Sequence, residues 1–146
     1  MIRPFKNSDK DILLGMAKRM HQESDWSVLP FSEMQAGNIA HKVMGGDYAC
    51  FVAEDIQIAG MIVGFVSQHY FTEAIIAADL LCYVIPEKRG GTHGYRLVKA
   101  FEQWAQEQGA SMVTLGITTG IKTDRTASLY KKLGYKQSGI LLRKEF

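Results

Sequence analysis

The sequence predicts a single α+β domain built around a mixed, mostly antiparallel β-sheet. A length of 146 residues suits one domain. Its middle holds three strand-like apolar runs joined by short connections, as in adjacent antiparallel strands. After them, helical patterns alternate with strand patterns, which adds crossover connections. We therefore expect one domain over residues 1–146, in the order strand, two helices, three strands, helix, strand, helix, strand.

The N-terminal part predicts one short strand and two helices. Residues 2–5 form the strand, and Ser8 or Asp9 caps a helix that runs to about Glu23. An irregular stretch with two aromatic residues and a proline covers residues 26–31. A second helix follows the cap residue Ser32 and ends at the glycine pair before Asp47.

The remaining elements follow from apolar runs and their stop signals. Strands are predicted at residues 48–53, 58–71 and 74–85, with glycines in the second run that allow a bulge. The next helix carries an apolar face containing Leu97, Phe101 and Trp104. The last three elements are a strand at 112–117, a helix at 125–133 and a strand at 139–146.

Composition excludes several classes of protein. Hydrophobic residues make up 47% and charged residues 22%, which is ordinary for a globular protein, and a net charge of +2 gives little support for nucleic-acid binding. Cys50 and Cys82 lie in apolar runs and are expected to be buried free thiols. We find no metal-binding spacing, signal-peptide core or membrane-length apolar run, so we expect a cytoplasmic protein without a metal or a membrane partner.

The segment from Val84 to Leu97 has the layout of a phosphate site. An apolar strand stops at Pro86, and a loop with Arg89 and three glycines leads into a helix. Loop amides and the positive end of a helix dipole attract an anion, and glycines let the backbone approach it. An arginine can hold phosphate oxygens in pairs.

Two motifs resemble those of the GNAT N-acetyltransferases. Val84-x-Pro86 followed by Arg89-Gly90-Gly91-Thr92-His93-Gly94 resembles the acyl-CoA loop of this family, written Arg/Gln-x-x-Gly-x-Gly/Ala. Ala127–Tyr135 contains Leu-Tyr-Lys-Lys-Leu-Gly-Tyr, which resembles the family's Leu-Tyr-x-Lys-x-Gly-Phe segment. The order of elements also fits the family from end to end. The resemblance implies a three-layer fold with about four helices around the sheet.

The sequence differs from the usual motifs of this family in two segments. Thr92 stands where relatives often have glycine, so the loop must avoid positive φ there, or the hydroxyl caps the helix or binds phosphate. Thr123 and Thr126 stand where relatives often have Asn and Ala, and the Asn often contacts the cofactor.

The resemblance implies acetyl-CoA as co-substrate. Its pantetheine arm would pair with the strand before Pro86 as an added strand, and its diphosphate would lie in the glycine loop. The expected cofactor-binding residues are Leu81, Cys82, Tyr83, Val84, Arg89, Gly90, Gly91, Thr92, His93, Gly94 and Tyr95.

The resemblance also implies a direct attack of a neutral amine on the thioester. Tyr130 matches the family's usual general acid, although a helix tyrosine packed against its neighbours is the alternative. Asp79, in an apolar strand, is a candidate base whose pKa burial would raise. The alternatives are that Asp79 is a bulge carboxylate with a local hydrogen bond, and that Glu23, His21 or a chain of waters is the base. A backbone amide near residues 82–84 would stabilise the oxyanion.

The acceptor is expected to be a primary amine of a small molecule or a protein. Trp26, Phe31 and Tyr70 could line its pocket, because the family places the acceptor near the first helices and the central hairpin; each could instead be a core residue. A CoA-binding or protein-interaction module without catalysis is the alternative function. A third possible function is an acetyltransferase that acts on charged tRNA, but a net charge of +2 gives it little support, because a stronger basic patch would be expected. The last strand could pair across a homodimer.

Overall fold

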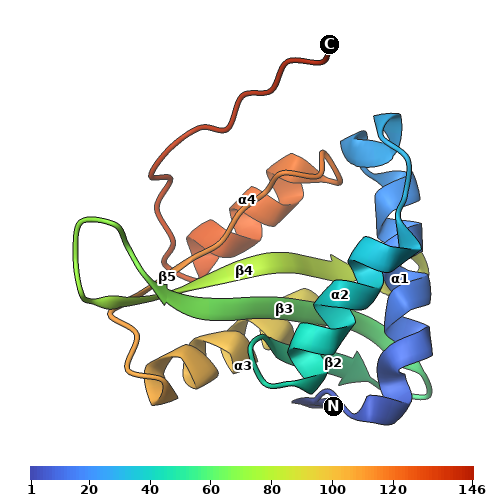
Figure 1. The fold of residues 1–146 in the computed structure, drawn as a ribbon, viewed down its shortest axis with the longest axis horizontal. Helices are drawn as coiled ribbons and strands as arrows, with labels where there is room; N and C mark the ends of the chain where they lie inside the picture. The colour runs from blue at the N-terminus through green and yellow to red at the C-terminus, as the bar shows by residue number, and fades with distance from the viewer.

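Five strands form one sheet in the computed structural model, which describes residues 1–146 (Figure 1). Their order in the sheet is the same as their order in the chain. The first four strands pair antiparallel and the fifth pairs parallel with the fourth, so the predicted mixed, mostly antiparallel sheet is confirmed. The strands are β1 (Ile2–Pro4), β2 (Ala49–Glu54), β3 (Ile58–Gln68), β4 (Ile75–Val84) and β5 (Met112–Thr114).

Four α-helices flank this sheet, in the predicted order. They are α1 (Lys10–Glu23), α2 (Glu33–Met44), α3 (His93–Glu107) and α4 (Thr123–Lys132). The predicted cap at Ser32 is present, because its hydroxyl accepts a hydrogen bond from the Gln35 amide at 3.1 Å. Short 3₁₀ turns lie at η1 (Asn7–Asp9), η2 (Asp25–Val28) and η3 (Pro86–Lys88). No helix is long and apolar enough to span a membrane.

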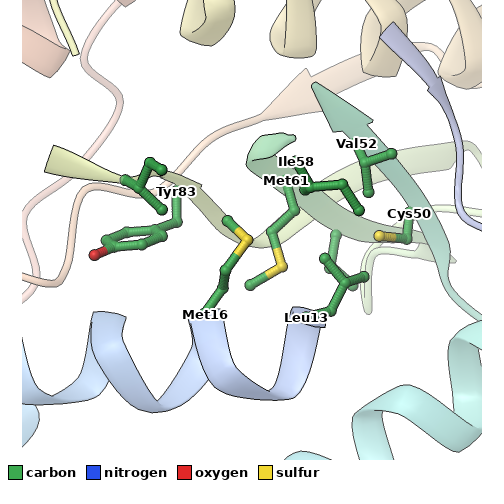
Figure 2. Close-up of a cluster of buried hydrophobic side chains, with 9 residues drawn as sticks. Leu13, Met16, Cys50, Val52, Ile58, Met61 and Tyr83 are labelled. Carbon is green, nitrogen blue, oxygen red and sulfur yellow. The ribbon is translucent and has the colours of Figure 1, made fainter. Parts of the chain in front are cut away.

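Each face of the sheet is covered by different helices. On one face, Leu13 and Met16 of α1 pack on alternate residues of the central strands, among them Cys50 and Met61 (Figure 2). On the other face, α3 and α4 cover a second apolar cluster. Its members are Ala53, Ile62, Ala77, Leu97, Val98, Phe101, Ala105 and Tyr130. The sheet therefore lies between two helical layers.

The packing of α3 fixes the end of β4. Leu97 and Phe101 have no exposed surface, and burying each side chain stabilises the fold by roughly 1.5–3 kcal/mol. Phe101 lies against Gly64 of β3, where an added Cβ would come within 2.5 Å of the Phe101 ring and 2.6 Å of the Ala78 carbonyl oxygen. This close approach needs glycine. Nearer the end of β4, Leu97 lies against Gly60, which pairs with Val84, and so places the first turns of α3 beside that end of the strand.

Three predicted strands differ from the observed ones. The strand predicted at 58–71 ends at Gln68, because the chain turns at residues 69–72 into β4. The strand predicted at 112–117 ends at Thr114, beyond which it no longer pairs with β4. The strand predicted at 139–146 is wrong: these residues form no strand, since no neighbouring strand pairs with them, and Leu142 is 87% exposed. Figure 1 shows this tail leaving the body of the protein beyond α4.

Candidate functional site

The site lies where β4 and the segment after β5 separate. Pairing between β4 and β5 ends at Ala78 and Thr114. Next to that point, Val63 pairs with Leu81 and Gly64 with Asp79, so Leu80 is an extra residue in β4. Such a bulge bends a strand and increases its twist. The edge of β4 from residue 80 to 84 that faces away from β3 is therefore left without a strand partner.

A cavity of about 440 Å³ opens along this free edge. Its walls come from the end of β4, the glycine loop, the start of α3, the segment 116–122 and α4. Both predicted catalytic residues, Asp79 and Tyr130, line it. So do the predicted cofactor-binding residues other than Thr92, namely Leu81, Cys82, Tyr83, Val84, Arg89, Gly90, Gly91, His93, Gly94 and Tyr95.

The glycine loop presents a row of free amides. No amide from Gly90 to Tyr95 donates a hydrogen bond within the protein, and the first internal bond of the helix runs from the Arg96 amide to the Thr92 carbonyl at 2.9 Å. Gly90 has a φ of +93°, which glycine adopts without strain. Thr92 has a φ of −101°, so the loop avoids positive φ there, and its hydroxyl makes no capping bond. Free amides at the start of a helix suit a diphosphate.

Asp79 connects the two separating strands. Its Oδ1 accepts a hydrogen bond from the Gly116 amide at 2.9 Å, across the fork. Burial raises the pKa of Asp79 to about 6, against the opposing effect of the Gly116 amide. The carboxyl group therefore combines the local hydrogen bond expected of a bulge residue with a pKa near neutrality and a place in the cavity wall.

Tyr130 enters the cavity from α4. The residue is 7% exposed, and its ring packs near that of Tyr135, with centroids 5.9 Å apart. Burial, and then the neighbouring Cys82 and Asp79, raise the pKa of Tyr130 above its ordinary value. The hydroxyl group is therefore protonated at neutral pH and available as a donor. Burial also raises the pKa of Cys82 to about 12, which leaves that thiol un-ionised.

Arg89 is bound to α1. Its Nη1 and Nη2 donate to the two carboxylate oxygens of Glu23, the latter at 2.9 Å, and its Nε donates to the Val84 carbonyl at 2.9 Å. Tyr83 donates to Glu23 Oε2 at 2.8 Å, and its ring lies 5.3 Å from the guanidinium carbon. The network lowers the pKa of Glu23, chiefly through Arg89. Arg89 thus holds α1 against the end of β4.

The other two candidate bases lie outside the cavity lining. Glu23 is paired with Arg89, and His21 Nε2 lies 2.7 Å from the Leu29 carbonyl oxygen. Of the three candidates, only Asp79 lines the cavity.

The three predicted acceptor residues also lie outside the cavity lining. Trp26 Nε1 donates to the Thr118 carbonyl at 2.9 Å and so supports the segment that forms one wall. Phe31 packs near His21, with ring centroids 5.4 Å apart. Tyr70 is 83% exposed at the tip of the β3–β4 hairpin. Their role as acceptor residues stays a prediction.

The sequence analysis placed Tyr130 of α4 in the site but missed the basic residues of α4 and of the segment before it. Lys122 and Arg125 line the cavity opposite the glycine loop, and so does Lys132. A signal for them was present: basic residues stand at the start of the predicted helix that carries Tyr130. The pairing of Arg89 with Glu23 had no sequence signal, since 66 positions separate them.

Comparison of the chain with family models gives one match. The model described as acetyltransferase (GNAT) domain matches residues 46–137, which is more than half of the chain. A comparison with curated protein sequences finds no match.

Solved structures of acetyltransferases share the fold over their whole length. An acetyltransferase from Trypanosoma brucei is 17% identical with a TM-score of 0.74, and the alignment covers 100% of this chain and 99% of that one. Ribosomal-protein-alanine N-acetyltransferase from Brucella melitensis biovar Abortus 2308 is 14% identical with a TM-score of 0.76, covering 100% and 99%. Glucosamine-6-phosphate N-acetyltransferase from Arabidopsis thaliana is 17% identical with a TM-score of 0.73, covering 100% and 97%. Two of these proteins are named for different acceptors, so the shared fold does not specify one.

Proposed function

Because this chain belongs to the GNAT acetyltransferase family, we propose that it transfers an acetyl group from acetyl-CoA directly to a primary amine of a small molecule or a protein. The observation that carries this proposal is that two surfaces suited to different parts of acetyl-CoA follow one another along one cavity. The free amides of residues 90–95 suit a diphosphate, and the unpaired edge of β4 at residues 80–84 suits an extended amide-bearing arm.

The bulge in β4 would set the position of the reacting carbon. An arm paired along residues 80–84 ends near Asp79, where the fork narrows to the Ala78–Thr114 pair. A backbone amide within residues 82–84 would donate to the carbonyl oxygen as negative charge develops on it. Such donors are effective because they are already oriented before the reaction.

Asp79 and Tyr130 would move the two protons of the reaction. Bound acetyl-CoA supplies the thioester, and its C–S bond breaks as the new C–N bond forms. Asp79, ionised above a pKa of about 6, accepts the proton that the amine loses and then releases it to solvent. Tyr130 donates its hydroxyl proton to the departing sulfur and is reprotonated from solvent, which leaves free CoA and the amide.

A thiol-release screen tests this function. The protein is incubated with acetyl-CoA and a panel of polyamines, amino acids, amino sugars and peptides with free N-termini, and released CoA is measured together with the mass of the product. We expect CoA release that depends on an amine, with a matching acetylated product. Binding of acetyl-CoA without turnover on any amine would instead support a CoA-binding module.

A further inference from the structure

The charged side chains around the cavity are unevenly paired. Six basic side chains line it, and Asp79 is the only acidic residue in the lining. Three of the basic side chains are held by carboxylates outside the cavity: Arg89 by Glu23, and Lys88 and His93 by Asp55, at 3.3 and 3.6 Å. The other three, Lys122, Arg125 and Lys132, make no hydrogen bond or ion pair within the protein. All three come from α4 or the residue before it.

Arg125 is the unpaired cation that faces the glycine loop. Its Nη2 lies 3.3 Å from the position that a Cβ would take on Gly90. The guanidinium therefore lies beside Gly90, the first residue of the loop whose amides are free. A loop on α3 and a cation on α4 thus face each other across one cavity.

Arg89 cannot take the same place without losing its own contacts. Its three nitrogen groups already have partners on Glu23 and on the Val84 carbonyl. Moving it toward a ligand would leave the Glu23 carboxylate, 29% exposed, without its cation. The arginine of the loop motif is therefore occupied in this chain.

We propose that Arg125 supplies the cationic contact to the diphosphate of the acyl-CoA, opposite the amides of the glycine loop. This inference rests on the proposed function, since it assumes that the loop takes the diphosphate. The two walls would close on the anion from both sides, with amides from α3 and a guanidinium from α4. The helix that carries Tyr130 would be drawn toward the loop by the same contact.

Isothermal titration with CoA and with dephospho-CoA tests the proposal. Arg125→Gln is expected to weaken both ligands to a similar degree, by roughly 10-fold to 100-fold, since a charge-assisted contact is lost. Affinity should also become less dependent on salt. Arg125→Lys should retain part of the affinity. Lys131→Gln, which removes one charge from the same helix outside the cavity lining, should change it by less than about twofold.

Three results would overturn the inference. Arg125→Gln could bind both ligands as the unmodified protein does. It could lose affinity for CoA but not for dephospho-CoA, which would place Arg125 at the 3′-phosphate instead of the diphosphate. Lys131→Gln could lose as much affinity as Arg125→Gln, which would reduce the effect to net charge. If the unmodified protein binds neither ligand, the proposed function fails, and this inference with it.

Discussion

Replacing Asp79 with asparagine should make the protein more stable at neutral pH. Burial raises the pKa of this carboxyl group from its ordinary 3.8 to about 6. The folded state therefore binds the proton more tightly than the unfolded state does. The resulting stabilisation is fully present below about pH 4 and is lost as pH rises through 6. Asparagine carries no charge, and its side-chain oxygen can still accept the hydrogen bond from the Gly116 amide at the fork.

The size of the effect follows from the shift in pKa. A change from 3.8 to about 6 corresponds to at most about 3 kcal/mol at pH 7.5. Because Asp79 retains some contact with solvent, we expect a gain of about 1–2 kcal/mol. The same substitution should lower the activity although it raises the stability. Most of the activity should be lost, and the fall of kcat/KM at acid pH, with a midpoint near pH 6, should disappear.

Urea denaturation at a series of pH values measures the stability difference. The gap between Asp79→Asn and the unmodified protein should grow from about pH 4 to pH 7 and then stay constant. Asp47→Asn provides the control, since this exposed side chain makes no hydrogen bond or ion pair. A variant no more stable than the original at pH 7.5, or a gap that does not change with pH, would refute the reasoning. An unaltered pH–rate profile would remove Asp79 as the base.

Three further predictions follow from individual contacts. Tyr130→Phe should lower kcat roughly 100-fold or more while the dissociation constant of acetyl-CoA stays unchanged; an unchanged kcat would exclude Tyr130 from proton transfer. Gly64→Ala should lower the free energy of unfolding by about 1–3 kcal/mol, because the added Cβ meets Phe101 and the Ala78 carbonyl, whereas Gly37→Ala, in an open helix position, should raise it by about 0.5–1 kcal/mol. Glu23→Gln should cost about 1–2 kcal/mol at pH 7 in urea denaturation. Pairing with Arg89 lowers the pKa of Glu23 from its ordinary 4.5. The stabilisation by this pair is therefore present above pH 4.5 and is lost as pH falls through the pKa of the folded state. An equal cost of Glu23→Gln at pH 3 would contradict a stabilising role of the ionised pair.

Local patterns predicted most of the fold. The cap at Ser32, the apolar stripe of α3 and the glycine turns act within a few residues, so the sequence shows them directly. The predicted cap at Asp9 is absent, because its carboxylate accepts hydrogen bonds from Arg3 and the Lys6 amide instead. The strand predicted at 139–146 failed because a strand needs a partner as well as a suitable composition. The shortening of the strand at 112–117 likewise depends on the separation of β4 from its neighbour.

The candidate site likewise has features that local motifs predict and features that depend on long-range contacts. The glycine loop and Tyr130 lie in motifs with local spacing, and the structure brings both to one cavity. The partner of Arg89 lies on α1, and the placement of Arg125 beside Gly90 depends on how α4 packs against the sheet. Such long-range contacts leave no local pattern, so the sequence did not show that Arg89 pairs with Glu23, and its contact with phosphate stays a prediction.

Amide NMR of the ¹⁵N-labelled protein titrated with CoA tests whether acyl-CoA binds in the cavity beside β4, because it shows where the ligand lies. We expect the largest shifts at the amides of residues 90–95 and 82–84, with smaller shifts along α4 near Arg125. The amides of α2, on the opposite face of the sheet, should stay unchanged. No shift at residues 90–95, or shifts concentrated away from the fork between β4 and β5, would contradict the assignment of this cavity to acyl-CoA.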